Sequence, residues 1–260
     1  MLSSRFTLSN SKPELKSLVP AAALLLSLNS SAVWAVTPTA EEIFKQSIQM
    51  FPKGSIQYEV NAKTVFSDDY SEEKSFLVVK KQTQPENMTV LIRFKQPEDV
   101  RCTSILVDQT EQLTERYVYL PAIGRSRLIP ESDQKKEMFG LGFSYEDINQ
   151  PKGQISWSQS PDNSEYYEIE VKDQDRRNLY KIAKKDLVLK EINYYSANNL
   201  NKTVYINQVA DVSGASVISQ WQLKSYQEGK DIYYKIDENT VSQQIQQGLL
   251  VKNRIKRCVF

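Results

Sequence analysis

Short segments in which apolar and polar residues alternate follow one another along most of this chain of 260 residues. Successive side chains of a strand point to opposite faces, so the segment from Ile56 to Phe66 would place its apolar residues on one face and leave the other to solvent. Turn-forming sequences such as Ser67-Asp-Asp69 separate the segments. The pattern predicts about eleven strands in a meandering antiparallel sheet. These strands are expected at residues 56–66, 75–80, 88–94, 104–107, 116–120 with a continuation near 127–129, 166–171, 179–183, 187–194, 202–209, 216–223 and 232–236.

A sheet of this size curls, and its concave face has to be filled by side chains, by a helix or by a ligand. The capping-box spacing of Thr39-Ala-Glu-Glu42 predicts a helix that can fill part of it. The insert between Ile129 and Gln150 can fill another part, and we interpret it as a short helix and loop with a hinge at Gly140 and Gly142. The predicted fold class is therefore mainly β, a strongly curved antiparallel sheet (open half-barrel) with a helical lid.

The two ends of the chain differ in character. Residues 1–35 contain basic residues, an apolar run from Leu18 to Leu28 and a small-residue cleavage site, a combination typical of an export signal. An uncleaved membrane anchor is the alternative, but the run is only about half as long as the roughly 20 residues that a spanning helix needs. Residues 36–260 are expected to form one domain outside the cytoplasm. At the C-terminus we expect a helical stretch near residues 242–247 and then a basic tail, and the alternative is a frayed end.

The formal charge of the chain is small. Removal of residues 1–35 takes away three basic residues and one acidic residue, which changes the net charge from +1 to −1. A nearly neutral protein is poorly suited to binding phosphate backbones, and basic pairs such as Lys184-Lys185 are more typical of solvated faces. We therefore expect no nucleic-acid partner.

The chain contains no histidine. This absence excludes Ser-His-Asp and Cys-His nucleophile activation within the chain, and histidine-based zinc sites with them. The acidic pairs Asp68-Asp69 and Glu146-Asp147 are more consistent with structural than with catalytic roles, because adjacent acids in a strand point apart and acids in turns usually cap or stay solvated. We predict no catalytic residue, no metal and no cofactor.

Cys102 and Cys258 are the two cysteines, and most of the chain separates them. In an oxidising compartment they could form a disulfide that fixes the C-terminal tail to the sheet. The alternative is a buried free Cys102 and a loose Cys258. The sequence leaves both alternatives open, and two distant thiols without histidine do not make a metal-site pattern.

Candidates for the wall of the concavity come from two predicted strands. Val90, Ile92 and Phe94 alternate along one of them, and Tyr117 and Tyr119 alternate along the other. Tyrosine suits a wall that is apolar inside and polar at its mouth, because its ring is apolar and its hydroxyl forms hydrogen bonds. The alternative for each of these residues is ordinary sheet core.

The insert supplies three further candidates, Phe139, Phe143 and Tyr145, which lie beside its glycines. We expect these aromatic side chains to contact the concavity as parts of a lid.

Charged residues near the insert could hold such a lid closed. Arg93, Arg125 and Arg127 are candidates for polar lid contacts or for contacts with a lipid headgroup, and pairing with acids such as Glu146 is the simpler alternative. A contact worth about 1 kcal/mol can be exchanged for contacts with a ligand, which would make the lid a switch.

Five short motifs follow one another between residues 93 and 148, and their order and spacing resemble the outer-membrane lipoprotein-sorting family in its broader, LolA-like branch. The resemblance covers most of residues 36–260 in architecture. Two departures stand out: Cys102 occupies a position where the family commonly has glycine, and Leu141-Gly142 replaces a common serine-aspartate pair. The five motifs are Arg93-Phe-Lys-Gln-Pro97, Thr103-Ser-Ile-Leu-Val107, Tyr119-Leu-Pro121, Arg125-Ser-Arg-Leu-Ile129 and Phe143-Ser-Tyr-Glu-Asp147.

The resemblance implies a curved β half-barrel closed by helices, with an apolar cavity that receives acyl chains. It implies a periplasmic, non-enzymatic carrier that binds lipid or the acylated end of a lipoprotein and transfers it towards the outer membrane. Its partners would be an inner-membrane transporter and an outer-membrane acceptor. Burial of each methylene contributes about 0.8 kcal/mol, so such a carrier has to replace this contact with its own apolar wall. The alternatives are a lipid-binding accessory partner of an inner-membrane transporter, and a periplasmic scaffold protein that binds no ligand.

Overall fold

The computed structural model describes residues 37–48, 54–84, 87–149, 153–159, 165–173, 176–196, 198–212, 214–246 and 248–260. The expected export signal at residues 1–35 lies outside these ranges. The chain from Pro38 onward forms one compact unit. Within the described ranges, no helix is long and apolar enough to cross a membrane.

Strands make up most of the described chain. The helix α1 spans Ala40–Ile48, and the short 3-10 helices η1 and η3 span Glu131–Asp133 and Lys252–Arg254. The first six strands are β1 (Gly54–Phe66), β2 (Ser71–Gln84), β3 (Asn87–Gln96), β4 (Ser104–Gln109), β5 (Thr114–Leu120) and β6 (Arg125–Leu128). The remaining strands are β7 (Gln154–Trp157), β8 (Tyr166–Asp173), β9 (Arg176–Ala183), β10 (Leu189–Ser196), β11 (Asn199–Val212), β12 (Ala215–Ser225) and β13 (Lys230–Ser242).

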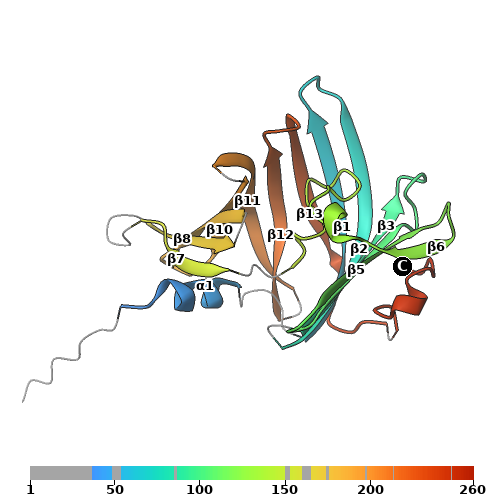
Figure 1. The fold of residues 1–260 in the computed structure, drawn as a ribbon, viewed down its shortest axis with the longest axis horizontal. Coiled ribbons are helices and arrows are strands. Elements are labelled where there is room, and N and C mark those ends of the chain that lie inside the picture. Colours follow the sequence, from blue (N-terminus) through green and yellow to red (C-terminus); the bar gives the residue numbers. More distant parts are fainter. Residues whose placement is uncertain are drawn as a thin grey trace, which may run out of the picture. The chain divides into compact units, whose positions relative to one another are not determined.

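All thirteen strands belong to one curved antiparallel sheet that does not close on itself (Figure 1). The strand order is β6-β5-β4-β3-β2-β1-β13-β12-β11-β10-β9-β8-β7. Two meanders, β1 to β6 and β7 to β13, therefore meet where β1 pairs with β13, with Ala62 opposite Tyr234. The predicted fold class, a mainly β protein built on a large, curved and open antiparallel sheet, is confirmed.

The structure has two strands more than the sequence pattern predicts. The segment near residues 127–129, expected as a continuation of the strand at 116–120, is the separate strand β6. A turn precedes it, in which the Gly124 N–H donates to the carbonyl oxygens of Leu120 and Pro121, both at 3.0 Å. The strand β7 has only four residues, too few for an alternating pattern to stand out.

The middle strands of the first meander are buried on both faces. Residues 76 to 79 of β2 and residues 90 to 94 of β3 are all buried. The expectation of one solvated face is therefore wrong for these strands. We call the face that carries Val60, Phe76, Val78, Val90 and Ile92 the inner face, and the face that carries Leu77, Val79, Leu91 and Leu106 the outer face.

The helix α1 begins with the expected capping box. The Glu42 N–H donates to Thr39 Oγ1 at 3.2 Å, and the Thr39 N–H donates to Glu42 Oε2 at 2.8 Å. These bonds satisfy backbone donors that the first turn of a helix leaves without partners. Its apolar side packs against β8 to β10, where the rings of Phe44 and Tyr180 meet edge to face with centroids 4.8 Å apart.

The C-terminal segment, residues 248–260, packs on the outer face of the first meander. Leu249 and Ile255 are buried there among the apolar side chains of β2 to β5. Residues 243–246 form no helix, and the one helical turn of the described tail is η3. The expected helical stretch is therefore wrong over residues 243–246. The frayed end, the alternative for the tail, is also wrong, because the tail covers apolar side chains that would otherwise face water.

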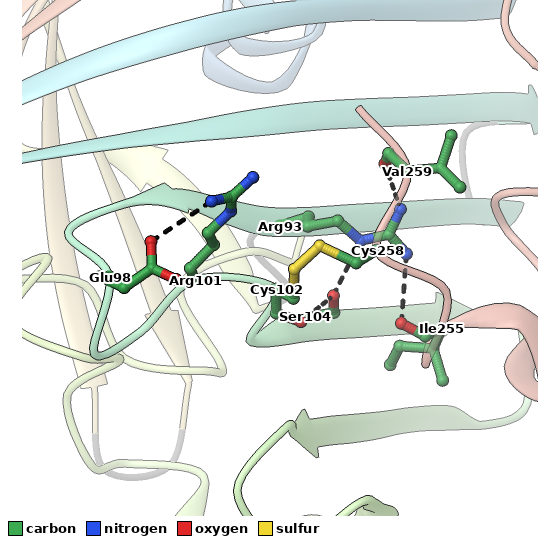
Figure 2. Close-up of a disulfide and its surroundings, with 8 residues drawn as sticks. All are labelled: Arg93, Glu98, Arg101, Cys102, Ser104, Ile255, Cys258 and Val259. Atoms are coloured by element: carbon green, nitrogen blue, oxygen red, sulfur yellow. Dashed lines mark hydrogen bonds and ion pairs between the residues drawn. A yellow bond between two sulfur atoms is a disulfide. The ribbon is translucent and has the colours of Figure 1, made fainter.

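Arg93 fixes the tail to the sheet (Figure 2). Its fully buried guanidinium group donates from Nε to Ser104 Oγ at 3.0 Å, from Nη1 to the Val259 carbonyl oxygen at 2.6 Å and from Nη2 to the Ile255 carbonyl oxygen at 3.1 Å. Burial lowers the pKa of Arg93, but a guanidinium group stays charged in proteins, so these hydrogen bonds are charge-assisted.

A disulfide between Cys102 and Cys258 joins the tail to the turn before β4, with the two Cα atoms 5.2 Å apart (Figure 2). Cys102 has a φ of +64°, in the left-handed region that favours glycine. Cys102 thus adopts a backbone conformation that glycine adopts more easily, while its side chain makes a covalent bond that glycine cannot make.

We expect the double variant Cys102→Ser/Cys258→Ser to lose about 2–4 kcal/mol of unfolding free energy, since the disulfide closes a long loop in the unfolded chain. The two cysteines are 156 positions apart. Urea titration measures the loss, and adding a reducing agent to the wild type should reproduce it while leaving the double variant unchanged. A wild-type midpoint that does not respond to the reducing agent would contradict a stabilising bond.

Candidate functional site

A cavity of about 410 Å³ lies on the inner face and is lined by the sheet, by the end of α1 and by the insert. Most of its wall is apolar. The insert, which we define as residues 130–149, contributes Met138, Leu141, Phe143 and Ile148 to this wall. The apolar wall residues of the sheet and of α1 are Ile48, Ile56, Tyr58, Val60, Phe76, Val78, Met88, Val90, Ile92, Val171, Tyr180, Leu189, Ile192, Tyr194, Val204, Ile206, Val217, Ile218, Trp221, Tyr234 and Ile236.

Of the wall residues predicted on β3, Val90 and Ile92 line the cavity. Phe94 is on the same face and fully buried, but it does not line the cavity. Its ring packs against the rings of Phe76 and Phe139, with centroids 5.8 and 5.5 Å away. The structure thus makes Phe94 part of the sheet core beside the cavity.

Tyr117 and Tyr119, predicted as wall residues, lie on the outer face and do not reach the cavity. The Tyr117 hydroxyl donates to Glu115 Oε1 at 2.7 Å and accepts from Lys252 Nζ at 2.6 Å, so this ring packs beneath the C-terminal tail. Alternation requires the two tyrosines to share a face, but it does not say which face. On β5 the inward side chains are those of Arg116 and Val118.

The aromatic part of the wall comes from residues that the sequence did not single out. Trp221 and Tyr234 stack across β12 and β13 with centroids 4.8 Å apart and ring planes inclined by 8°. Burial raises the pKa of Tyr58 and of Tyr180 to about 12, and it raises the pKa of Tyr194 well above its ordinary value. Their hydroxyl groups therefore stay protonated and neutral, as suits an apolar wall. Tyr58 lies in the alternating pattern of the first predicted strand, which is a signal that could have identified it.

The insert is a loop, of which only η1 is helical. An antiparallel bridge joins Glu137 to Ser144, and the Met138 N–H donates to the Phe143 carbonyl oxygen at 2.8 Å. This hairpin-like loop buries Met138 and Leu141 against the inner face. The resemblance implies a serine-aspartate pair at positions 141 and 142. This chain instead has Leu141, whose side chain is buried, and Gly142, which contacts the sheet.

The predicted lid residues have different environments. Phe143 lines the cavity, and Lys202 Nζ lies 5.4 Å from its ring centroid. Phe139 packs on Phe94, outside the cavity wall. Tyr145 is half-buried against the same core, and burial raises the pKa of its hydroxyl although the charge of Arg127 opposes the shift.

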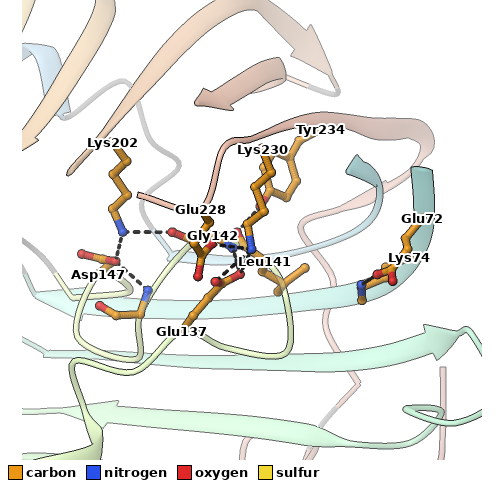
Figure 3. A network of polar contacts seen from close by, with 11 residues as sticks. Glu72, Lys74, Glu137, Leu141, Gly142, Asp147, Lys202, Glu228, Lys230 and Tyr234 are labelled. Atoms are coloured by element: carbon orange, nitrogen blue, oxygen red, sulfur yellow. Dashed lines mark hydrogen bonds and ion pairs between the residues drawn. The ribbon is translucent and has the colours of Figure 1, made fainter. Parts of the chain in front are cut away.

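Two lysines of the second meander hold the insert against the sheet (Figure 3). Lys202 Nζ donates to Asp147 Oδ2 at 2.5 Å and to the Gly142 carbonyl oxygen at 3.0 Å. Lys230 Nζ donates to both carboxylate oxygens of Glu137, at 2.8 and 2.9 Å. Burial opposes the charge of Lys230, but hydrogen bonds with Glu137 and Glu228 outweigh it and raise the pKa of this lysine.

The hydroxyl group of Tyr234 adds a further bond, which it donates to the carbonyl oxygen of Leu141 (Figure 3). These bonds to the insert come from β11 and β13, which are far from it in sequence, and Arg116 of β5 and Arg176 of β9 add further polar contacts. Neither lysine stands out in the sequence, because lysines are common at the ends of solvated strands.

The arginines predicted to hold the insert do not do so. Arg93 is buried on the outer face, and Arg125 and Arg127 have exposed side chains on β6. Glu146, which lines the cavity, forms an ion pair with Arg176 of β9 at 3.4 Å. The predicted polar contact of Glu146 with an arginine near the insert is therefore replaced by a contact with an arginine of the second meander.

The described residues contain no group of cysteine, aspartate and glutamate side chains arranged to hold a metal ion. What the arrangement offers chemically is a covered apolar space with neutral tyrosine hydroxyl groups in its wall and a few charged side chains at its boundary. Such a space binds apolar molecules by excluding water from them.

A family model with the description "Uncharacterized protein" matches residues 86–257. No curated relative matches the chain. Among solved structures, a DUF1329 family protein from Desulfovibrio piger has a TM-score of 0.73 at 18% identity, covering 83% of this chain and 97% of that chain. A domain described as outer membrane lipoprotein-sorting, from Vibrio parahaemolyticus, has a TM-score of 0.73 at 16% identity, with coverages of 84% and 98%.

A LolA superfamily protein from Nitrosomonas europaea is similar as well, with a TM-score of 0.67 at 17% identity over 84% of this chain and 99% of that chain. At such low identities the likeness concerns the fold. The predicted resemblance to the lipoprotein-sorting family is confirmed at that level.

Gly142 provides a sharp test of how closely the insert packs. A Cβ atom at this position would lie 2.7 Å from Leu223 Cδ2, and its φ is +64°. Gly124 has a φ of +66° with nothing within 4 Å of such an atom, so it is a matched control. We expect Gly124→Ala to lower the unfolding free energy by about 1 kcal/mol, because alanine is strained in this backbone conformation. Gly142→Ala should lower it by about 1–3 kcal/mol more, because its Cβ atom would also overpack against Leu223. If the two variants lost equal unfolding free energy in urea titration, the insert would not be closely packed against the sheet.

Proposed function

The chain belongs to the family whose model matches residues 86–257, and it has a LolA-like fold. On this premise we propose that it is a non-enzymatic periplasmic carrier that binds lipid or the acylated end of a lipoprotein. Transfer of the cargo would run towards the outer membrane. An inner-membrane transporter would deliver the cargo and an outer-membrane acceptor would receive it. The export signal expected in residues 1–35 supports the proposed compartment.

The observation that carries the proposal is the apolar cavity on the inner face. Its volume of about 410 Å³ lies within the range typical of small-molecule sites. Each methylene that enters it contributes about 0.8 kcal/mol, which favours long apolar chains as ligands.

The way in which the insert is held also suits a carrier. Its apolar contacts, made by Met138 and Leu141, are of the kind that an acyl chain can replace. Two of its polar contacts, Lys202 with Asp147 and Lys230 with Glu137, are lysine–carboxylate pairs whose partners would be solvated if the insert moved. If the ligand replaced these contacts of the insert, its acyl chain could enter the cavity while the sheet stayed folded.

The acidic pairs that could suggest proton transfer have structural surroundings. Asp68 and Asp69 lie in an exposed turn, where Asp68 Oδ1 accepts from the Tyr70 N–H at 3.3 Å. Asp147 accepts from the Ser144 N–H at 2.6 Å and from Lys202. These contacts support a binding function over an enzymatic one.

Mass spectrometry of lipids from gently purified mature protein tests the proposal directly. We expect an acylated molecule in the extract, because an apolar cavity of this size gains free energy by excluding water. Triacylated lipoprotein would identify lipoprotein sorting, and free phospholipid would favour the accessory partner of an inner-membrane transporter. An empty protein that also fails to take up fluorescent acyl probes would leave the scaffold alternative and overturn the proposal.

Filling the cavity should block binding without unfolding the protein. We expect Val90→Phe and Val217→Phe each to raise the dissociation constant of a fluorescent acyl probe by about 15-fold, the equivalent of two excluded methylenes or about 1.6 kcal/mol. Both valines line the cavity. Val251→Phe, at an exposed valine, makes the same change away from the cavity and should leave binding unaltered. Unchanged affinity in both cavity variants, with normal unfolding midpoints, would place the ligand elsewhere.

A further inference from the structure

The strand β6 (Arg125–Leu128) stands at one end of the sheet order, so it has a neighbouring strand, β5, on only one side. All four of its residues are exposed. The outer edge of such a strand presents backbone N–H and C=O groups with which a further strand can pair. The sheet can therefore be extended at β6 by a segment of another chain.

The hydrogen bonds between β5 and β6 determine which backbone groups point outward. The Ile129 N–H donates to the Arg116 carbonyl oxygen at 2.8 Å. In an antiparallel ladder such bonded pairs recur at every second residue, so the backbone of Arg127 also bonds to β5. The N–H and C=O groups of Ser126 and Leu128 then point away from β5, towards the side on which the described chain has no further strand.

The outward edge is short, because the chain ends it on both sides. Pro130 has no N–H group, and its carbonyl oxygen accepts from the Asp133 N–H at 2.9 Å. At the other end, the Gly124 N–H is used within the turn that precedes β6. A partner would therefore pair over a short extended segment, through the backbone groups of Ser126 and Leu128.

The two arginines of β6 share one face. Arg127 lies opposite Val118 of the inner core, and Arg125 lies opposite Leu120, which packs against the same core. Directly opposite residues of an antiparallel pair have their side chains on the same face, so both guanidinium groups project on the inner face. The side chain of Leu128, which is 54% exposed, projects on the outer face.

No ion pair joins either arginine to an acid within the described ranges. The nearby acids of the insert have other partners, Asp133 with Lys136 at 2.7 Å and Glu146 with Arg176 at 3.4 Å. A short edge strand with charged residues is protected against unspecific pairing. Two charges of one sign on one face repel a basic strand, including a second copy of β6, but they attract an acidic strand.

We propose that β6 binds an extended acidic segment of a partner protein, which adds to the sheet as a further strand. Backbone hydrogen bonds with Ser126 and Leu128 hold the segment, and the charges of Arg125 and Arg127 select it. Because side chains alternate along a strand, the acids of the segment occupy every second position. The positions between them lie on the side of Leu128, which favours apolar residues there. The inference does not rest on the carrier function.

A fluorescein-labelled peptide in which glutamate and valine alternate tests the proposal. A second peptide, in which lysine replaces glutamate, has the same length and the opposite charge. We expect the wild type to bind the glutamate peptide about tenfold more tightly than the lysine peptide, because two cross-strand charge pairs change from attraction to repulsion. Equal affinities for the two peptides, or binding of neither, would overturn the proposal.

Amide hydrogen exchange measured by NMR locates the contact. The amides of Ser126 and Leu128 should exchange more slowly when the glutamate peptide is bound, since new hydrogen bonds protect them. If the peptide bound without protecting these amides, charge attraction without strand addition would explain the binding and the proposal would fail. Protection in the concentrated protein alone would make a second copy the occupant, which is likewise incompatible with it.

Charge reversal tests the role of the arginines. The double variant Arg125→Glu/Arg127→Glu should prefer the lysine peptide. The matched control is Lys63→Glu/Lys235→Glu, which makes the same change in net charge at exposed positions of β1 and β13, in the middle of the sheet, and should keep the preference for the glutamate peptide. The same effect in both double variants would reduce the selection to overall charge and contradict a site at β6.

A backbone variant tests the strand pairing. Leu128→Pro removes an outward N–H group and leaves the bonds between β5 and β6 in place, as proline at an edge strand can. We expect it to weaken binding of the glutamate peptide about tenfold relative to Leu128→Ala, with the same midpoint of urea unfolding, because one hydrogen bond to the partner is lost and a carbonyl group is left unpaired. Equal affinities of these two variants would show that the backbone edge is not used.

Discussion

The rest of the structure depends on a sheet whose middle strands are apolar on both faces. A sheet of this kind cannot leave either face to water, so it needs two covers. Both covers are segments of the chain that lie outside the strands. The insert, residues 130–149, covers part of the inner face, and residues 248–260 cover the outer face of the first meander. One strand, β3, serves both sides, with Ile92 facing the insert side and Leu91 facing the tail.

The two covers are attached in different ways. The outer cover is held by a covalent bond at Cys258 and by the buried guanidinium group of Arg93. The inner cover is held by lysine–carboxylate pairs, by hydrogen bonds from the buried guanidinium group of Arg116 and by apolar side chains, and a cavity of about 410 Å³ lies beneath it. A covalent bond thus fixes the described cover of the outer face, whereas non-covalent contacts alone hold the described cover of the inner face. On the proposed carrier function, this difference would let the inner cover move while the outer cover stays in place.

The sequence predicts the strands, the capping box of α1 and the location of the insert, because all three depend on patterns between near neighbours. It fails where a choice depends on distant contacts. The alternation of Tyr117 and Tyr119 is real, yet these residues lie on the outer face because the tail covers them there. The arginine at position 93 looks like a surface residue until Ile255 and Val259 are brought to it from more than 160 positions away. A usable signal was present in the apolar runs 76–79 and 90–92, which are too continuous for a strand with one solvated face.

The pairing of β1 with β13 in the middle of the sheet has a consequence for how the chain acquires its structure. Within each meander, every strand pairs with its neighbour in sequence, so most contacts are local and can form quickly. The pairing at the centre is different, since it joins Ala62 to Tyr234 and has to wait until both meanders exist. The main chain passes from one meander to the other through the segment between β6 and β7. A single cut in that segment would leave two pieces, each a complete set of hairpins, that pair through the edges of β1 and β13 and stay joined by the Cys102–Cys258 disulfide until it is reduced.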